Sequence, residues 1–197
     1  MRSGANKSGG GPVFLSAVFL LTAFSALGAV QPIDAARSTM TVRVYKAGLL
    51  SAFGHDHEIS APIAEGSVDL EAKKVELRVN AAGLRVLDPK TSEKDRTEVQ
   101  ANMLGADVLD VQNYKEIRFH STHVESAGAG AWKVTGELSL HGVTKPVSME
   151  VREGQGRYAG KCRIKITDFS IKPIKAAGGT VRVKDEVDVE FEIQLAH

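Results

Sequence analysis

Polar and apolar residues alternate strictly along the end of the chain. In "EVDVEFEIQLAH", residues 186–197, every second residue from Val187 to Leu195 is apolar and the residues between them are charged or amide side chains. A period of two with one apolar face predicts a half-buried antiparallel strand. The same alternation recurs in six shorter runs, which lie at residues 42–44, 75–79, 117–119, 138–140, 147–151 and 164–166.

Turn signals separate these runs, among them "APIAEG", "SAGAGA", "HGVTKP", "REGQG" and "AAGG". Several short strands joined by such turns predict a barrel or a sandwich. Closing a meander into a barrel removes its exposed edges, and eight strands enclose either packed side chains or one small ligand. The inward positions are mostly Val, Leu, Ile and Met. The interior could therefore carry an apolar ligand or simply be packed, and periodicity alone does not separate the two.

One segment interrupts the alternation. "TSEKDRTEVQANMLGADVLD", residues 91–110, is rich in helix-forming residues and has Val99 and Met103 four apart. Ser92 followed by Asp95 resembles a capping box, and Gly105 is a suitable stop. The pattern predicts one helix, around residues 92–104, inserted between strands.

The first 36 residues differ in composition from the rest. Arg2 and Lys7 precede "GPVFLSAVFLLTAFSALGAV", an apolar run at residues 11–30 that ends in the small residues "ALG". This pattern is typical of a secretory signal peptide, with a second, weaker cleavage site at residues 35–36. A retained anchor is the alternative, since spanning a bilayer takes about 20 apolar residues. We predict a signal peptide over 1–36, a single domain over 37–197, and a periplasmic or secreted location.

Charge and motifs narrow the function classes. The chain has 25 basic and 24 acidic residues, a formal net charge of +1, and few aromatic residues, which argues against nucleic acid as a partner. Cys162 is the only cysteine, so no intramolecular disulfide forms, and it is most simply a small apolar strand residue. No Gly-x-Ser-x-Gly, His-Glu-x-x-His or Cys-x-x-Cys motif is present. We expect no catalytic activity and no cofactor.

A longer string carries a family resemblance. "GELSLHGVTKPVSMEV", residues 136–151, resembles the signature of the YceI-like family of periplasmic polyisoprenoid-binding proteins. Three other stretches support this resemblance: "AAGLRVLDPKTSEKDRTEVQANML" at 81–104, "LDVQNYKEIRFHST" at 109–122 and "ITDFSIKP" at 166–173. The resemblance as a whole covers about residues 38–196, nearly all of the chain after the predicted signal peptide.

The resemblance implies an eight-stranded antiparallel lipocalin-like barrel around an elongated apolar tunnel. It also implies a partner, an amphiphilic lipid with an isoprenoid tail such as a quinone or a polyprenyl phosphate. The chain departs from the family pattern at Lys46, where many members have histidine, at Lys115, where proline is common, and at Ser170, where glycine is usual. These departures leave the headgroup open.

The segment "GHDH", residues 54–57, lies outside the common family pattern. On a strand, His55 and His57 share a face with Phe53 and Ile59, towards the barrel interior or its mouth. Three interpretations stay open: a polar mouth for a ligand headgroup, structural histidines bonded to turn backbone, or a metal site. The last, a metal-binding protein or metal-dependent enzyme, is the rival function. It needs a third or fourth ligand, for which His141 is a candidate.

His120 and His123 are three apart, so a regular strand would turn them to opposite faces. Arg96, early in the predicted helix, could meet an anionic headgroup at one barrel end. The lipid carrier would contact a membrane surface for exchange, and an exposed edge near Cys162 could pair two copies. The complete set of predicted ligand-binding residues is Phe53, His55, His57, Leu77, Arg96, Phe119, Leu138, Leu140, Met149, Ile164 and Phe191.

Overall fold

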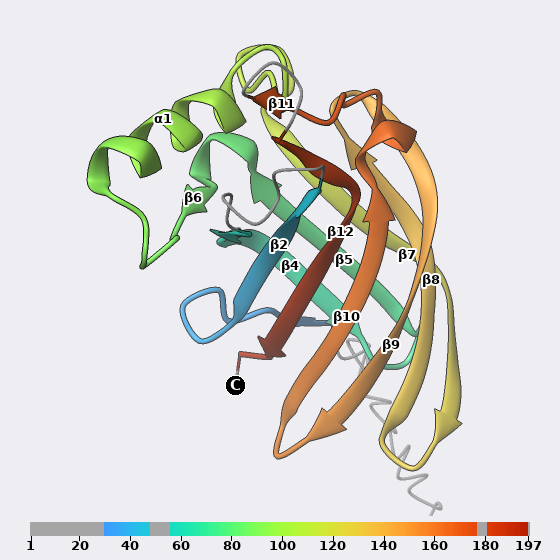
Figure 1. Cartoon of the computed structure of the whole chain (residues 1–197). Coiled ribbons are helices and arrows are strands. Elements are labelled where there is room, and N and C mark those ends of the chain that lie inside the picture. Colours follow the sequence, from blue (N-terminus) through green and yellow to red (C-terminus); the bar gives the residue numbers. More distant parts are fainter. Residues whose placement is uncertain (1–29, 48–55, 177–180, 197) are drawn as a thin grey trace, which may run out of the picture.

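The structure is a computed structural model that describes residues 30–47, 56–176 and 181–196 (Figure 1). Within these ranges the chain forms twelve strands, all in one antiparallel sheet, and one α-helix. The strands are β1 (Val30–Pro32), β2 (Thr39–Ala47), β3 (His57–Ser60), β4 (Ile63–Asp69), β5 (Lys74–Asn80), β6 (Arg85–Val86), β7 (Glu116–Gly128), β8 (Ala131–Leu140), β9 (Val143–Gly154), β10 (Arg157–Lys165), β11 (Lys175–Ala176) and β12 (Val181–Gln194). The helix is α1 (Glu93–Leu104), and η2 (Ala81–Gly83) and η3 (Ile166–Phe169) are short 3-10 turns.

The sheet curls until its two ends meet. Its order is β1-β4-β5-β7-β8-β9-β10-β12-β2-β3-β6, and β3 and β4 are consecutive in the chain, separated by Ala61 and Pro62. β3 pairs with β2 and β4 pairs with β5, so one bent segment joins both ends of the sheet. A bridge between Ile33 and Leu195 adds a second closure. The predicted lipocalin-like barrel is confirmed.

The strand count differs from eight for a local reason. β3 and β4 together fill one position in the barrel wall, and Pro62 splits them because proline has no N–H for the ladder. This bent segment counts as one long strand of the barrel wall. The other seven are β2, β5, β7, β8, β9, β10 and β12, which together with it make the eight strands that the family resemblance implied. β1, β6 and β11 are short additions of two or three residues each.

The N-terminal edge of the barrel falls inside the predicted signal peptide. β1 pairs with β4, and Ile33 is buried against Ile63, Ile193 and Leu195. Cleavage after residue 36 would remove these contacts, whereas cleavage at "ALG" would leave them in place. The leader itself lies outside the described residues and stays a prediction. Of the residues described, none belongs to a helix both long and apolar enough to cross a membrane.

The helix forms where the sequence predicts it. The Ser92 hydroxyl accepts a hydrogen bond from Asp95 N at 3.1 Å, and Gly105 follows the last turn. Met103 is buried and Val99 packs beside it, so the two apolar positions face the barrel. Gln100 fastens the helix to β6, because its Oε1 accepts from Val86 N at 2.8 Å and its Nε2 donates to Leu84 O at 2.9 Å.

The most specific string of the sequence builds a tight hairpin. Leu140 pairs with Val143, and the two residues between them have positive φ, 51° at His141 and 74° at Gly142. Two consecutive positive φ values are typical of the type I′ turn, which matches the twist of antiparallel strands. The His-Gly dipeptide is therefore needed for the β8–β9 turn.

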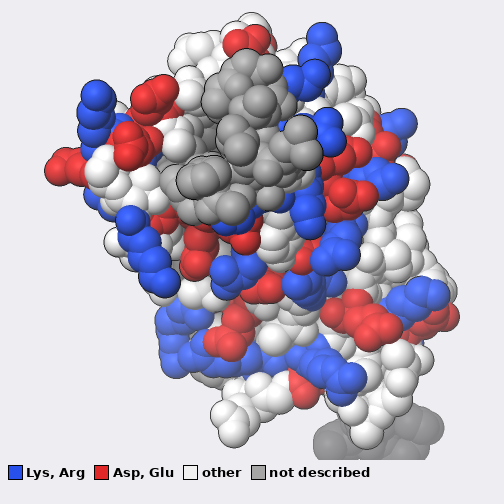
Figure 2. All heavy atoms as spheres, in the orientation of Figure 1, with Lys and Arg blue, Asp and Glu red and all other residues white. Residues whose placement is uncertain are grey.

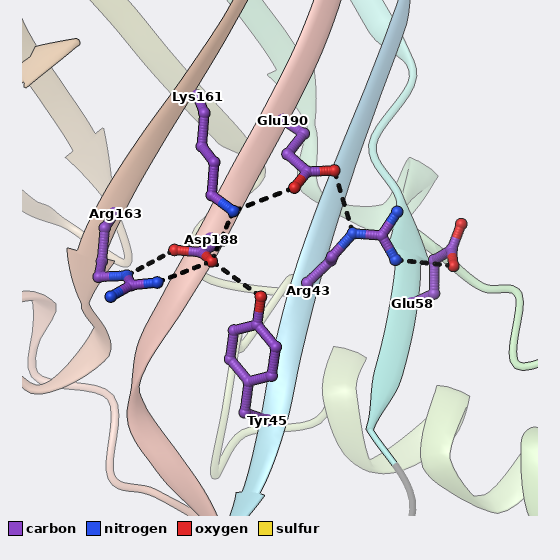
Figure 3. Close-up of polar contacts among 7 residues, drawn as sticks. All are labelled: Arg43, Tyr45, Glu58, Lys161, Arg163, Asp188 and Glu190. Carbon is purple, nitrogen blue, oxygen red and sulfur yellow. Dashed lines mark hydrogen bonds and ion pairs between the residues drawn. The ribbon is translucent and has the colours of Figure 1, made fainter.

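Charges of both signs are interspersed over the face of the molecule shown in Figure 2. One cluster links four neighbouring strands on the outside of the barrel (Figure 3). At its centre, Asp188 is 1% exposed and accepts hydrogen bonds from Arg163 Nε at 2.6 Å and Tyr45 Oη at 2.8 Å. Lys161 bridges Asp188 and Glu190. The cluster continues through Arg43 to Glu58.

The hydrogen bond from Arg163, with those from Lys161 and Tyr45, holds the pKa of Asp188 well below its ordinary value despite burial. The same contacts raise the pKa of Arg163 and Tyr45. The cluster therefore ties β3, β2, β12 and β10 into one panel of the barrel wall.

Candidate ligand-binding cavity

The barrel encloses a cavity of about 820 Å³. Every long strand contributes its inward-facing residues to the wall, which is mainly aliphatic and aromatic. Two glycines make room for aromatic rings in that wall. A Cβ on Gly136 would lie 2.5 Å from the Phe119 ring, and one on Gly160 would collide with the Phe191 ring. The two phenylalanines therefore lie flat across the adjacent strands.

Most of the predicted lining residues lie on this wall. Leu77, Phe119, Leu138, Leu140, Met149, Ile164 and Phe191 all line the cavity, as does His57. Phe53 and His55 lie outside the described residues. Arg96 is half-buried on α1 and is not part of the wall, whereas its neighbours Asp95 and Glu98 are. Contact of these residues with a ligand stays a prediction.

A bulge in β7 overturns one expectation from periodicity. The register between β7 and β8 shifts between Ser121 and His123, so Phe119 and Val124 both line the cavity. His120 and His123 consequently both lie on the outer surface rather than on opposite faces. They contact different carboxylates, Glu137 at 3.1 Å and Glu125 at 3.5 Å.

Polar side chains are confined to the two ends of the cavity. At the end covered by α1, the upper end in Figure 1, the wall includes Lys46, Asp95, Asn102, Lys172 and Arg182. At the opposite end, near the β4–β5 turn, it includes Asp69, Lys74, Glu153 and Tyr158. The cavity is therefore an apolar channel with charged groups at both ends.

His57 is the histidine that belongs to the cavity wall. Its Nδ1 lies 2.6 Å from Oδ2 of Asp88, whose side chain is 1% exposed. The other carboxylate oxygen of Asp88 accepts from Glu58 N at 2.8 Å. Asp88 thus fixes the imidazole at the start of β3, close to the charged end of the cavity. Sequence reasoning missed Asp88, since nothing in "RVLDPK" relates it to a histidine 31 residues earlier.

The contacts of His141 are with the backbone and with an aromatic ring, as expected for a structural histidine. Its Nδ1 lies 3.1 Å from the carbonyl oxygen of Phe169, and its ring centroid is 4.4 Å from that of Tyr114. It is not part of the cavity wall. Within residues 30–47, 56–176 and 181–196, no three His, Cys, Asp or Glu side chains come close enough together to hold a metal ion.

Cys162 is buried in the wall, as the sequence predicts for a small apolar residue. Burial, with a smaller contribution from Asp188, raises the pKa of its thiol, so the reactive thiolate is disfavoured at neutral pH. Sequence reasoning also missed several wall residues: Val134, Val187, Val189, Ile193 and Trp132. The alternation of residues 187–195 was a sufficient signal for three of them.

A closed antiparallel barrel with an apolar cavity defines a barrel-fold binding protein. The sequence profile of the YceI-like domain matches residues 32–195, so the chain belongs to the YceI-like family. The resemblance drawn from residues 136–151 is thereby confirmed.

Curated relatives are named UPF0312 proteins. The protein of Shewanella oneidensis is 28% identical over 167 residues, which cover 80% of this chain and 83% of that protein. That of Pseudomonas putida is 33% identical over 132 residues, 62% of each chain. That of Vibrio campbellii is 31% identical over 119 residues, 55% of this chain and 59% of the relative. The chain thus spans about three fifths of the length of the last two relatives.

Among solved structures, BcnA of Burkholderia cenocepacia superposes with a TM-score of 0.61 at 18% identity, covering 84% of this chain and 99% of that protein. This likeness supports the fold. A Campylobacter jejuni YCEI protein superposes with a TM-score of 0.47 at 16% identity, covering 78% of this chain and 85% of that one.

Proposed function

We propose that this protein is an exported, non-catalytic carrier of a single amphiphilic lipid whose isoprenoid tail lies along the interior cavity. The observation that carries the proposal is the cavity itself. Its volume of about 820 Å³ falls within the range of about 300–1,000 Å³ typical of small-molecule sites. Its wall is mainly aliphatic and aromatic.

The length of the cavity favours a long tail. On β8 the wall runs from Trp132 to Leu140, eight residue-to-residue steps that span about 26 Å at about 3.3 Å per step. With a strand tilt of about 40°, this corresponds to about 20 Å along the barrel axis. One leaflet of a bilayer is only about 15 Å thick in its hydrocarbon region. Each buried methylene would contribute about 0.8 kcal/mol to binding.

The headgroup fits the end beside α1. His57 is oriented there by Asp88, and Lys46 and Lys172 also line that end. Imidazole and ammonium groups bind carbonyl or phosphate oxygens, which both candidate headgroups possess. This end is the expected site for a quinone carbonyl or a polyprenyl phosphate.

The carrier would act outside the cytoplasm, as its leader suggests, and would load and unload at a membrane surface. A lipid with a long apolar tail has little solubility in water, so transfer requires close approach to the bilayer. Pairing of two copies through the strand of Cys162 stays a prediction, since β10 pairs with β12 along its whole length but with β9 only as far as Lys161.

Native mass spectrometry of the protein purified from its own compartment, followed by solvent extraction, tests the proposal. We expect a stoichiometric adduct that extracts as one prenyl lipid. An adduct that extracts as a two-chain phospholipid, or a protein that stays empty after incubation with prenyl lipids, would contradict the proposal.

A metal-binding function is the second candidate, because His57 contacts an acidic side chain and His55 lies two residues before it. It predicts a stoichiometric metal in the same spectrum, lost in His57→Ala. A metal adduct without any lipid would favour this candidate over the carrier.

A further inference from the structure

The barrel wall contains a seam between β9 and β10. These strands pair from Gly154 and Arg157 at their hairpin to Glu150 and Lys161, where the ladder ends. Both strands nevertheless continue, β9 back to Val143 and β10 on to Lys165. Figure 1 shows the two arrows diverging from their hairpin towards the end of the barrel that carries α1.

The sequence explains why the ladder stops. η3 follows directly after β10 and contacts both strands, and Pro146, opposite Lys165 in the extrapolated register, has no N–H with which a ladder could resume. Beyond the paired part, Cys162 Sγ makes a long contact across the seam, 3.8 Å from the carbonyl oxygen of Ser148.

The seam is thin as well as unpaired. An open hollow of about 780 Å³ lies on its outer side, lined by Pro146, Arg163 and Phe169 among others. Val147 and Ile164 line both this hollow and the interior cavity. A single layer of side chains therefore separates the outside from the channel. Phe169 of η3, 1% exposed, packs into the core beside this layer.

The wall on each side of the seam is firmly held. β9 pairs with β8 along ten consecutive residue pairs, from Ala131 with Arg152 to Leu140 with Val143. β10 pairs with β12 along nine, and the Asp188 cluster fastens it to β12 and β2 (Figure 3). Opening the wall between β8 and β9 or between β10 and β12 would break a backbone ladder, whereas opening the seam breaks none beyond Glu150.

We propose that the seam between Val143–Met149 of β9 and Cys162–Lys165 of β10 is the lateral entrance of the cavity, closed by Phe169 of η3. An apolar chain passes sideways between the two panels instead of sliding end-on along the whole channel. The paired hairpin end, from Glu150 to Lys161, acts as the hinge. This inference rests on the proposed lipid-carrier function.

A disulfide across the seam tests the entrance. Ser148→Cys and Arg163→Cys, made together in a Cys162→Ser background, place two thiols on the outer face where the extrapolated register brings these residues opposite each other. The matched control is Glu150→Cys with Lys161→Cys, the last pair of residues that lie opposite each other in the ladder. Each pair removes one cationic partner of Asp188, and the control pair also removes the carboxylate of Glu150.

Entry is followed by stopped flow with a short-chain ubiquinone, which quenches the single tryptophan, Trp132, in the cavity wall. We expect the oxidised seam variant to take up the quinone at least about tenfold more slowly than its reduced form. The oxidised control should differ from its reduced form by less than about twofold. Equal uptake by the oxidised and reduced seam variant, with the disulfide verified by mass, would overturn the proposal.

Phe169→Leu provides an independent measurement on a chain without engineered cysteines. A smaller side chain in the seam should speed both uptake and release by about threefold or more, and leave the equilibrium affinity nearly unchanged. Unchanged or slower exchange would contradict the role of Phe169.

Failure of the carrier function is distinguishable from failure of the entrance. If no quinone quenches the Trp132 fluorescence of the unmodified protein, and the protein retains no prenyl lipid, the proposed function is wrong. The proposed entrance is then wrong as well. If the protein binds the quinone at equilibrium and the disulfide leaves the rate unchanged, only the entrance is wrong.

Discussion

Substitutions at two positions with positive φ are expected to change the free energy of unfolding in opposite directions. Ser170 ends η3 at φ 62°, where a β-carbon is disfavoured, and the chain has serine in place of the glycine usual in the family. Gly142 has φ 74°, and a Cβ there would lie 2.5 Å from the Tyr114 ring. The local backbone conformation therefore determines whether a substitution at each position stabilises or destabilises the fold.

We expect Ser170→Gly to raise the free energy of unfolding by about 0.5–1 kcal/mol, because glycine adopts this conformation without strain. Gly142→Ala should lower the same quantity by at least about 1 kcal/mol, through both backbone strain and the clash. Urea unfolding monitored by Trp132 fluorescence measures both variants. A loss of stability in Ser170→Gly would contradict the argument.

Leu140→Arg tests the cavity at the level of one side chain. Leu140 is 8% exposed and lines the channel, so an arginine there would bring a charge into the space of the lipid tail. We expect loss of lipid retention in the mass spectrum while the barrel still folds. The matched control is Ser139→Arg, since the Ser139 hydroxyl lies on the exposed face beside Thr144. Undiminished lipid retention in a folded Leu140→Arg variant would show that Leu140 does not contact the lipid tail.

At the scale of elements, one amide side chain makes two hydrogen bonds that attach the helix, in addition to the packing of Met103 and Val99. Gln100 bonds both Leu84 O and Val86 N, and α1 has few other contacts with the sheet. Its apolar face is narrow, with Met103 as its only fully buried residue. The position of α1 over the cavity end is thus set by a polar contact that a hydrophobic pattern does not contain.

We expect Gln100→Ala to destabilise the region of α1 by about 1–2 kcal/mol, because it leaves Val86 N and Leu84 O without their partners. Hydrogen exchange of the α1 amides should become faster while exchange in β8 and β9 stays the same. Gln100→Glu keeps the acceptor for Val86 N and loses only the donor, so its effect should be intermediate. Equal exchange in all three proteins would show that packing alone holds the helix.

At the scale of the whole molecule, the outer ionic cluster makes stability depend on acid. The pKa of Asp188 is below its ordinary value of 3.8 in the folded state, and that of Glu190 is also lowered, chiefly by Arg43. A depressed carboxyl pKa stabilises the fold above the unfolded-state pKa and loses that contribution as the pH falls towards the folded-state value. The cluster therefore stabilises the barrel fully at neutral pH and progressively less below about pH 4.

We expect Asp188→Asn to lower the free energy of unfolding at pH 7 by about 2–3 kcal/mol, since it leaves Arg163 and Lys161 without their buried counter-charge. The variant should also lose less stability than the wild type between about pH 4 and pH 2. Thermal unfolding across pH measures both effects. Glu192→Gln, which removes a partly exposed pair with Arg157, is the control and should cost less than about 1 kcal/mol. Parallel pH profiles for Asp188→Asn and the wild type would contradict the assignment.

The seam is also a feature of the whole molecule, because it exists only where β9 and β10 lie side by side in the barrel wall. Neither β9 nor β10 is unusual in its own pattern, and Pro146 lies in a run that alternates normally. The ladder ends because η3 and proline act together on strands that the chain places side by side. Slower uptake across an oxidised seam is accordingly a property of the assembled barrel.

The turn that the sequence predicted at "APIAEG", residues 61–66, is wrong, because the structure has the start of β4 (Ile63–Asp69) there. By itself the sequence predicted the other seven long strands, the helix and the turn at His141–Gly142. Each depends on local rules: alternation of period two, a capped run of helix-forming residues, and positive φ at a two-residue hairpin. Seven predicted apolar residues line the cavity because strand parity survives wherever the ladder is regular. The motif at residues 136–151 also identified the family, because a tight turn between long strands leaves few alternatives at its central positions.

Only the tertiary structure decided the rest. The bulge in β7 placed His120 and His123 on one face, Asp88 became the partner of His57 from 31 residues away, and the helix turned Asp95 rather than Arg96 towards the cavity. Long-range contacts of this kind depend on how distant segments are brought together, which a local pattern does not encode. The same holds for the cavity, since the alternation that makes one face apolar does not state whether side chains fill the space it encloses.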